Sequence, residues 1–149
     1  MNLLEAYQNV KQIDTGRLVD ECMSELRPLV IDLNLFQLEQ GLNADGKKFR
    51  RYKNQAYAAK KNSMNSLPGF GTPDLKLTGS FWKAFKADLK SGIMDIYSTD
   101  PKAGWLEDGT KKMQSFAKIY GLTKENMNIL RTEFLLLFNE RLRKEIGLQ

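Results

Sequence analysis

The sequence predicts an α+β fold in which several helices pack on a small antiparallel sheet. Three observations predict this fold. Apolar residues recur at helical spacing over residues 3–38 and again over residues 124–146, where they define a long C-terminal helix. Between them, at about residues 81–98, two aromatic and β-branched runs flank Ser91 and Gly92, which is a hairpin signal.

The length of the chain fits one domain. A chain of 149 residues buries roughly two thirds of its unfolded surface, enough for one compact core. We expect residues 1–149 to form a single domain, with the helical region 1–27 as a candidate separate arm. The longest purely apolar run is 134–138, far below the roughly 20 residues of a membrane span, and the first five residues lack a basic signal-peptide start. We therefore expect no membrane association.

The apolar pattern of the N-terminal third of the chain predicts three helices. The first ends before the break at residues 14–16, and its apolar positions are Leu3, Leu4, Tyr7, Val10 and Ile13. A second apolar set runs from Leu18 to Leu26, and a third follows Pro28 as far as Gly41. Pro28 suits the first turn of a helix and equally suits a kink within one longer helix.

The middle of the chain is predicted to be basic and rich in loops. A short helix is expected over residues 55–60, and turn formers make residues 67–73 an irregular loop. We interpret residues 81–98 as strand, turn and strand, although the first run also fits a helix. A short turn or helix around Trp105, and then a polar, mobile stretch through Lys111 and Lys112, are expected to follow.

The C-terminal helix is expected from about Lys124 to Ile146. Thr123 can cap it, and Leu122 with Met127 fits a hydrophobic staple across the cap. One face carries Met127, Leu130, Phe134, Leu137, Phe138, Leu142 and Ile146. Further leucines widen this stripe, which is explained either by core packing or by contact with a neighbouring subunit. The candidate oligomer-interface residues are Leu135, Leu136 and Phe138.

The composition argues against an enzyme. The sequence has no histidine, which removes the commonest general base and the usual zinc ligand. The single cysteine, Cys22, lies among helix-forming residues and is interpreted as a core side chain. Asp100, Glu107 and Asp108 lie close in sequence, but carboxylates near a turn more often cap backbone amides than bind metal. We expect no catalytic residues, no metal and no cofactor.

The positive charge is concentrated in one segment. The chain carries a net +5, yet residues 46–73 contain seven basic residues and no acidic one, so the rest of the chain has a net −2. The basic residues are Lys47, Lys48, Arg50, Arg51, Lys53, Lys60 and Lys61. Interleaved aromatic residues are typical of a nucleic-acid surface. A solvated surface, or one facing an acidic neighbouring subunit, explains the same pattern and is favoured.

Several segments, in the same order, resemble the minor tail and virion-morphogenesis proteins of tailed bacteriophages. The first segment, 38–47, is followed by Tyr52, Tyr57, Ala58 and Lys61. The others are Pro73–Phe81 (PDLKLTGSF), the residues STD, KA and LE within 96–107, and Tyr120–Asn126 (YGLTKEN). The resemblance covers residues 31 to about 147, and it does not extend to the helical region before Pro28.

This resemblance implies a virion structural protein. Similar proteins are α+β and form rings, so we expect a ring of six or twelve copies in the neck or tail, which joins a portal or connector to the tail. The implied partners are further copies of the chain, portal or connector proteins and tail proteins, with non-specific contact to genomic DNA. The implied location is the virion, and the host cytoplasm during assembly. A basic nucleic-acid-binding module is the alternative function.

Overall fold

The computed structural model describes residues 2–64, 68–111 and 113–148, and it has the predicted α+β architecture. The helices are α1 (Leu3–Gln12), α2 (Thr15–Glu25), α3 (Arg27–Glu39), α4 (Gln55–Met64), α5 (Ser80–Lys83), α6 (Ala103–Asp108) and α7 (Lys124–Glu145). The strands β1 (Phe85–Lys90) and β2 (Ile93–Ser98) form one antiparallel hairpin.

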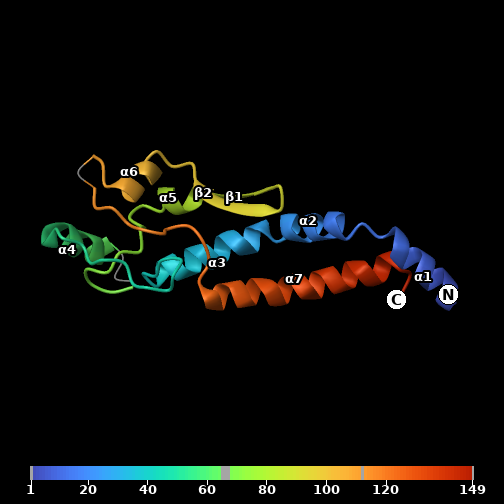
Figure 1. Ribbon diagram of the computed structural model, residues 1–149. Helices are drawn as coiled ribbons and strands as arrows, with labels where there is room; N and C mark the ends of the chain where they lie inside the picture. Colours follow the sequence, from blue (N-terminus) through green and yellow to red (C-terminus); the bar gives the residue numbers. More distant parts are fainter. Residues whose placement is uncertain (1, 65–67, 112, 149) are drawn as a thin grey trace.

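The molecule is elongated (Figure 1). Helices α2 and α3 follow one another as a rod, with α7 along one side of the rod and the hairpin along the other. Helices α4, α5 and α6 gather at one end. Helix α1 lies at the opposite end, beside the C-terminal end of α7.

The helix boundaries near the N-terminus follow from capping. The Asp14 carboxylate accepts a hydrogen bond from the Arg17 N–H at 2.9 Å, which starts α2 after a break at residues 13–14. Pro28 lies in the first turn of α3, where its missing N–H costs no helical bond. The Leu26 N–H still reaches the Cys22 carbonyl at 3.1 Å, so α2 and α3 meet at Leu26 as two helices of one rod.

The predicted hairpin is confirmed, but its first strand begins later than expected. The prediction of a strand over residues 81–84 was wrong, because Ser80–Lys83 forms the helical turn α5. Gly79 precedes this turn with a φ of 88°, a conformation that suits glycine. The turn places the rings of Phe81 and Phe85 in contact, with centroids 5.2 Å apart, and both rings are buried. A four-residue spacing places two residues on one face of a helix and also on one face of a strand, so the spacing of Phe81 and Phe85 alone does not distinguish the two.

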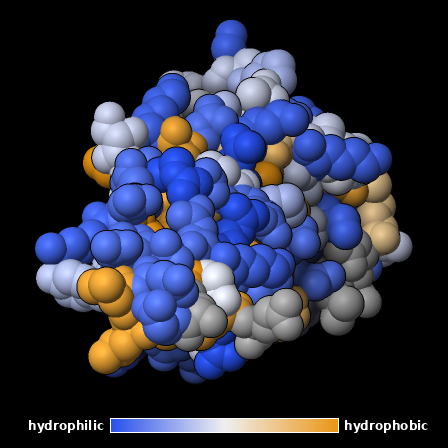
Figure 2. Space-filling view, turned by 90° about the vertical axis from the view of Figure 1, so that its right-hand side faces the viewer, coloured by the Kyte–Doolittle hydropathy of each residue, from blue (hydrophilic) through white to orange (hydrophobic). Residues whose placement is uncertain are grey.

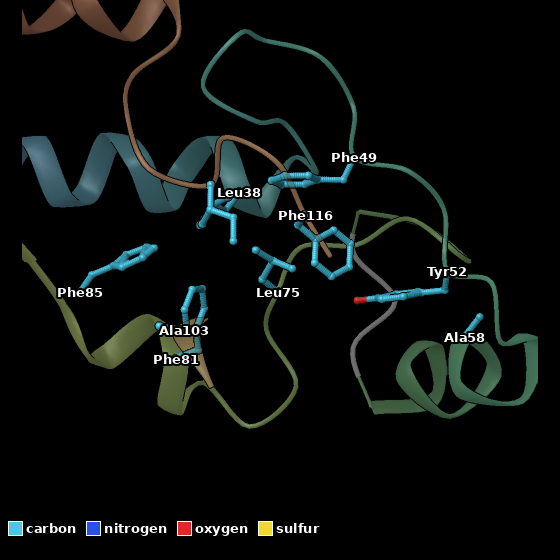
Figure 3. Close-up of a cluster of buried hydrophobic side chains, with 10 residues drawn as sticks. Leu38, Phe49, Tyr52, Ala58, Leu75, Phe81, Phe85, Ala103 and Phe116 are labelled. Carbon is cyan, nitrogen blue, oxygen red and sulfur yellow. The ribbon is translucent and has the colours of Figure 1, made fainter. Parts of the chain in front are cut away.

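The larger core lies at the broad end of the molecule. It joins α3, the loops around the basic segment, α5 and the segment before α7, and Figure 3 shows its side chains pointing toward one another. The members are Leu38, Phe49, Tyr52, Ala58, Leu75, Phe81, Phe85, Ala103, Phe116 and Ile119. The rings of Phe49 and Phe116 meet edge to face at 5.6 Å, a favourable aromatic geometry.

The smaller core runs along the rod. Val30 and Leu33 of α3 pack between Ala87 of β1 and Leu130 of α7, so α3 is covered from both sides. Farther along, Cys22 of α2 is fully buried, as expected of a core side chain, and burial raises the pKa of its thiol. Arg141 of α7 pairs with Glu21 of α2 at 3.1 Å. Packing and ion pairs together hold α7 to the rod.

Helix α7 is not deeply buried, and it carries apolar side chains on exposed as well as half-buried positions. The predicted cap is confirmed, since the Thr123 hydroxyl accepts a hydrogen bond from the Asn126 N–H at 3.2 Å. Of its 22 residues, all of them described, only Asn126 and Leu130 are buried. The rest of the expected apolar face is half-buried, apart from Met127, which is exposed. One side of α7 is therefore left without a partner in a single copy of the chain.

Candidate functional site

The basic segment alternates buried aromatic residues with exposed cations. Phe49 and Tyr52 are buried in the larger core, whereas six of the predicted cations are exposed: Lys47, Lys48, Arg50, Arg51, Lys53 and Lys60. The aromatic side chains anchor the loop and turn its basic side chains outward. The segment thus presents a positive surface on a fixed backbone at the broad end of the molecule.

Gln114 holds this loop in place. Its side-chain amide nitrogen donates to the Arg50 and Arg51 carbonyls at 3.0 and 3.1 Å, and its amide oxygen accepts from the Lys53 N–H at 3.1 Å. Gln114 lies just beyond the stretch through Lys111 and Lys112 that the sequence predicts to be polar and mobile. Lys112 of that stretch lies outside the described residues. The sequence gives no sign that Gln114 organises a loop more than sixty residues away.

Lys61 does not belong to the exposed basic surface. Its side chain is 5% exposed, and its ammonium nitrogen lies 2.7 Å from a carboxylate oxygen of Asp74, whose side chain is 1% exposed. The same carboxylate oxygen accepts the Lys76 N–H at 2.9 Å. Lys61 therefore ties α4 to the loop that leads into α5, and the available surface has one cation fewer than the sequence predicts.

The predicted oligomer-interface residues of α7 fall into two groups. Leu135 and Leu136 are 49% and 63% exposed, and Ile129 nearby is 47% exposed. Phe138 is half-buried, and its ring stacks on that of Phe134 with centroids 5.7 Å apart. Leu135 and Leu136 are thus free for a neighbour, whereas Phe138 also contributes to the fold of the single chain.

Further apolar side chains are exposed at the opposite end of the molecule. On α1 they are Leu3, Leu4, Tyr7 and Val10, which are 53–89% exposed. Figure 2, which looks at the end where α1 lies, shows apolar side chains standing out from a mostly hydrophilic surface. Phe36 on α3 is also 53% exposed. The apolar surface of the chain is therefore distributed over several helices.

A cavity of about 480 Å³ opens beside the basic segment. Its walls come from the start of α4, residues 75–81, α6 and residues 113–116. Most of the wall is apolar or aromatic, and Lys53, Lys76 and Lys102 are the charged lining residues. Burial raises the pKa of the lining phenols of Tyr52 and Tyr57, which keeps them neutral. The sequence does not reveal this cavity, because its walls are far apart along the chain.

The buried polar residues that join α3 to the start of α7 have a structural role. The side-chain oxygen of Gln37 accepts from the Thr123 N–H at 3.0 Å and the Asn126 amide at 3.1 Å, while its nitrogen donates to the Gly121 carbonyl at 2.7 Å. Asn34 bonds the Ile119 carbonyl and the Gly121 N–H, both at 3.1 Å. We call Asn34, Gln37 and Asn126 the polar clamp. The clamp fixes the start of α7 against α3.

Gly41 also serves packing. Its φ is 73°, and a Cβ atom there would lie 2.7 Å from the Thr72 methyl carbon and 3.1 Å from the Pro73 carbonyl oxygen. Backbone and side chain together leave no room for another residue. The first two motif segments therefore meet at Gly41. The glycine in this part of the resemblance is explained by packing.

The described residues contain no group of three or more side chains suited to a metal ion. Two of the carboxylates considered from the sequence accept backbone amides: Asp100 from Lys102 at 2.8 Å and Asp108 from Thr110 at 3.0 Å. No helix in the described part of the chain is long and apolar enough to cross a bilayer. The features that remain for function are the basic surface, the cavity and the exposed apolar faces.

Comparison of the chain with known proteins finds no matching family model, no matching curated protein and no matching solved structure. The resemblance of the motif segments rests on the sequence.

Proposed function

We propose that the protein is a structural component of a tailed-bacteriophage virion, a neck or tail-completion protein that forms a ring between the portal or connector and the tail. The observation that carries this proposal is the exposed apolar surface of α7, where Leu135 and Leu136 are 49% and 63% exposed. Large apolar side chains gathered on a surface are typical of protein interfaces. The resemblance of the motif segments supports a virion setting for that interface.

In the fold, the motif segments pack on one another and leave other surfaces for contacts between copies. Gly41 packs against the loop at Pro73, and Gln37 binds the segment that starts at Tyr120. The motif segments therefore build one scaffold, while the exposed surfaces lie around it. A scaffold protein of this kind acts through contacts between copies and with neighbouring proteins. Contacts between unlike surfaces of identical copies close into a ring when the rotation per copy allows it.

Leu136→Glu is expected to prevent assembly without unfolding the chain. Because Leu136 is 63% exposed, a carboxylate there stays hydrated in the single copy but is desolvated in an interface. We expect wild-type rings of six or twelve copies by native mass spectrometry, and monomers with an unchanged melting temperature for the variant. Phe138→Glu should instead lower the melting temperature, because Phe138 is half-buried.

Asn139→Glu provides the matched control, since Asn139 is an exposed polar residue on the same helix. It should assemble like the wild type. Normal assembly of Leu136→Glu would remove α7 from the interface. A wild-type chain that stays monomeric at all concentrations, alone and with its neighbouring virion proteins, would contradict the ring itself.

Nucleic-acid binding is the second candidate function, favoured by the six exposed cations of the basic segment. If these cations bind phosphates, the logarithm of affinity should fall with the logarithm of salt concentration by about 0.7 to 0.9 per phosphate neutralised. We expect weak and sequence-blind binding, because the segment has no helix-turn-helix, zinc or aromatic-sheet framework that would present it to bases.

A titration of duplex and single-stranded DNA at three salt concentrations measures this slope. Charge reversal of Lys47, Lys48 and Arg50 should reduce it, whereas Lys124→Glu, an exposed cation of α7, should not. Tight binding that distinguishes sequences would contradict the ranking and place the nucleic-acid function first. If the cations instead face an acidic neighbour, their reversal should block assembly.

A further inference from the structure

The cavity beside the basic segment has the chemistry of a socket for an apolar helix. Leu75, Leu77, Phe81 and Phe116 contribute its apolar wall, and no carboxylate occurs among its described lining residues. Lys53, Lys76 and Lys102 are its charged lining residues, and the Lys76 ammonium lies 4.6 Å from the centre of the Trp82 ring. The socket therefore suits apolar side chains that are accompanied by a negative charge.

Helix α1 carries such a set of side chains. Its apolar residues Leu3, Leu4, Tyr7 and Val10 are 89%, 64%, 55% and 53% exposed, and none of its ten residues is buried. Glu5 is the single charged residue between positions 3 and 10, and the first cation of the helix is Lys11. The N-terminal turns of α1 thus combine apolar surface with one negative charge, which complements the positive charge of the three lysines that line the socket.

The attachment of α1 leaves this surface available. The helix is separated from α2 by the non-helical residues 13–14, and its hydrogen bond to the end of α7, from the Asn9 amide to the Ile146 carbonyl, is 3.4 Å long. Figure 1 shows α1 and the C-terminal end of α7 at the opposite end of the molecule from α4 and α6, which line the socket. Helix α1 is therefore an arm that a neighbouring molecule can reach.

An arm cannot fill the socket of its own copy. The rod of α2 and α3, residues 15–39, is roughly 37 Å long, because an α-helix rises 1.5 Å per residue. The socket adjoins the far end of this rod, whereas α1 is only about 15 Å long by the same rise and is joined to the near end by two residues. The α1 helix of a second copy of the chain is therefore the occupant that can reach the socket.

We propose that α1 of one copy occupies the cavity between α4, α5 and α6 of the next copy. Because arm and socket are different surfaces at opposite ends of the molecule, each copy uses its arm on one neighbour and its socket on the other. Such heterologous contacts propagate from copy to copy until a ring closes. This inference rests on the proposed ring, to which it adds a second contact between copies beside that of α7.

Two variants separate arm from socket. Deletion of residues 2–13 removes the arm and leaves the socket. Thr78→Trp places a large ring on an exposed socket residue and leaves the arm. Each variant alone is expected to be monomeric by native mass spectrometry. An equimolar mixture should form heterodimers and nothing larger, because the only functional arm then meets the only functional socket.

Further variants provide controls and a second route. Ser63→Trp introduces the same ring at an exposed position of α4 that does not line the cavity, and it should assemble like the wild type. If Thr78→Trp lowers the melting temperature, Lys53→Glu replaces it as the socket variant, since Lys53 is exposed. In the heterodimer, Tyr7→Ala on the arm should raise the dissociation constant by about tenfold or more, whereas Gln8→Ala should leave it unchanged.

The outcomes distinguish this inference from the proposed function. If the arm-deleted chain folds and still assembles like the wild type, or if folded variants fail to form heterodimers, the arm-and-socket contact is wrong while the ring survives. If the wild-type chain itself never assembles, the ring proposal fails as well. Heterodimers formed only between the complementary variants support the contact.

Discussion

Gln37→Met is expected to lower the free energy of unfolding by about 3–5 kcal/mol, which is a large part of the total for a domain of this size. Methionine has a similar volume but loses three hydrogen bonds, to the Gly121 carbonyl, the Thr123 N–H and the Asn126 amide. Gln37 is 1% exposed, so water cannot replace these partners. Each buried polar group left unpaired costs about 1–3 kcal/mol.

Urea-induced unfolding, followed by circular dichroism, measures this effect. Gln40→Met is the matched control, because Gln40 is exposed just beyond α3 and its substitution should change stability by less than about 0.5 kcal/mol. Equal stability of the two variants would show that the polar clamp does not hold α7 against α3.

Lys61→Met is expected to destabilise the protein by about 3–5 kcal/mol, since removing one partner of a buried ion pair deprives the other charge of its counter-charge. Here the remaining charge is that of Asp74, whose side chain is 1% exposed. Adding Asp74→Asn to this variant should restore part of the loss, because it removes the buried charge. Double-mutant analysis of the unfolding curves gives the coupling between the two residues.

Lys60→Met serves as the control for this pair. Lys60 precedes Lys61 in α4 but is exposed, so its loss should leave stability nearly unchanged. A Lys61→Met variant as stable as Lys60→Met would contradict a structural role for the ion pair. The two variants also show which of the adjacent lysines contributes to any DNA binding.

Local signals in the sequence predicted most of the secondary structure. The C-terminal helix followed from its apolar spacing and the Thr123 cap, and the hairpin turn followed from Ser91 and Gly92, whose φ values of 50° and 75° suit a two-residue turn. The helical turn at Phe81 was missed because its aromatic residues fit a strand and a helix equally well. In the folded chain, contact between Phe81 and Phe85 decides for the helix.

Long-range contacts explain what the sequence could not predict. The Lys61 side chain looks like one more surface cation until Asp74 is brought beside it. The bonds of the polar clamp join residues 84–93 positions apart, so nothing local marks Gln37 or Asn126 as buried. The cavity is likewise assembled from four separate stretches. By contrast, six cations of the basic segment are exposed, as expected of charged side chains, and Lys61 is the exception.

The polar clamp also has a consequence for how the protein is made. A ribosome synthesises α3 long before α7, and a domain generally folds as a unit. Until residues 119–126 emerge, the side chains of Asn34 and Gln37 lack the backbone groups that they bind in the folded chain, and Val30 and Leu33 are not yet covered by α7. The nascent rod is therefore incomplete until the last quarter of the chain has been translated. Ribosome-bound chains that end before Tyr120 should remain sensitive to protease, and full-length chains should acquire their resistance in one late step.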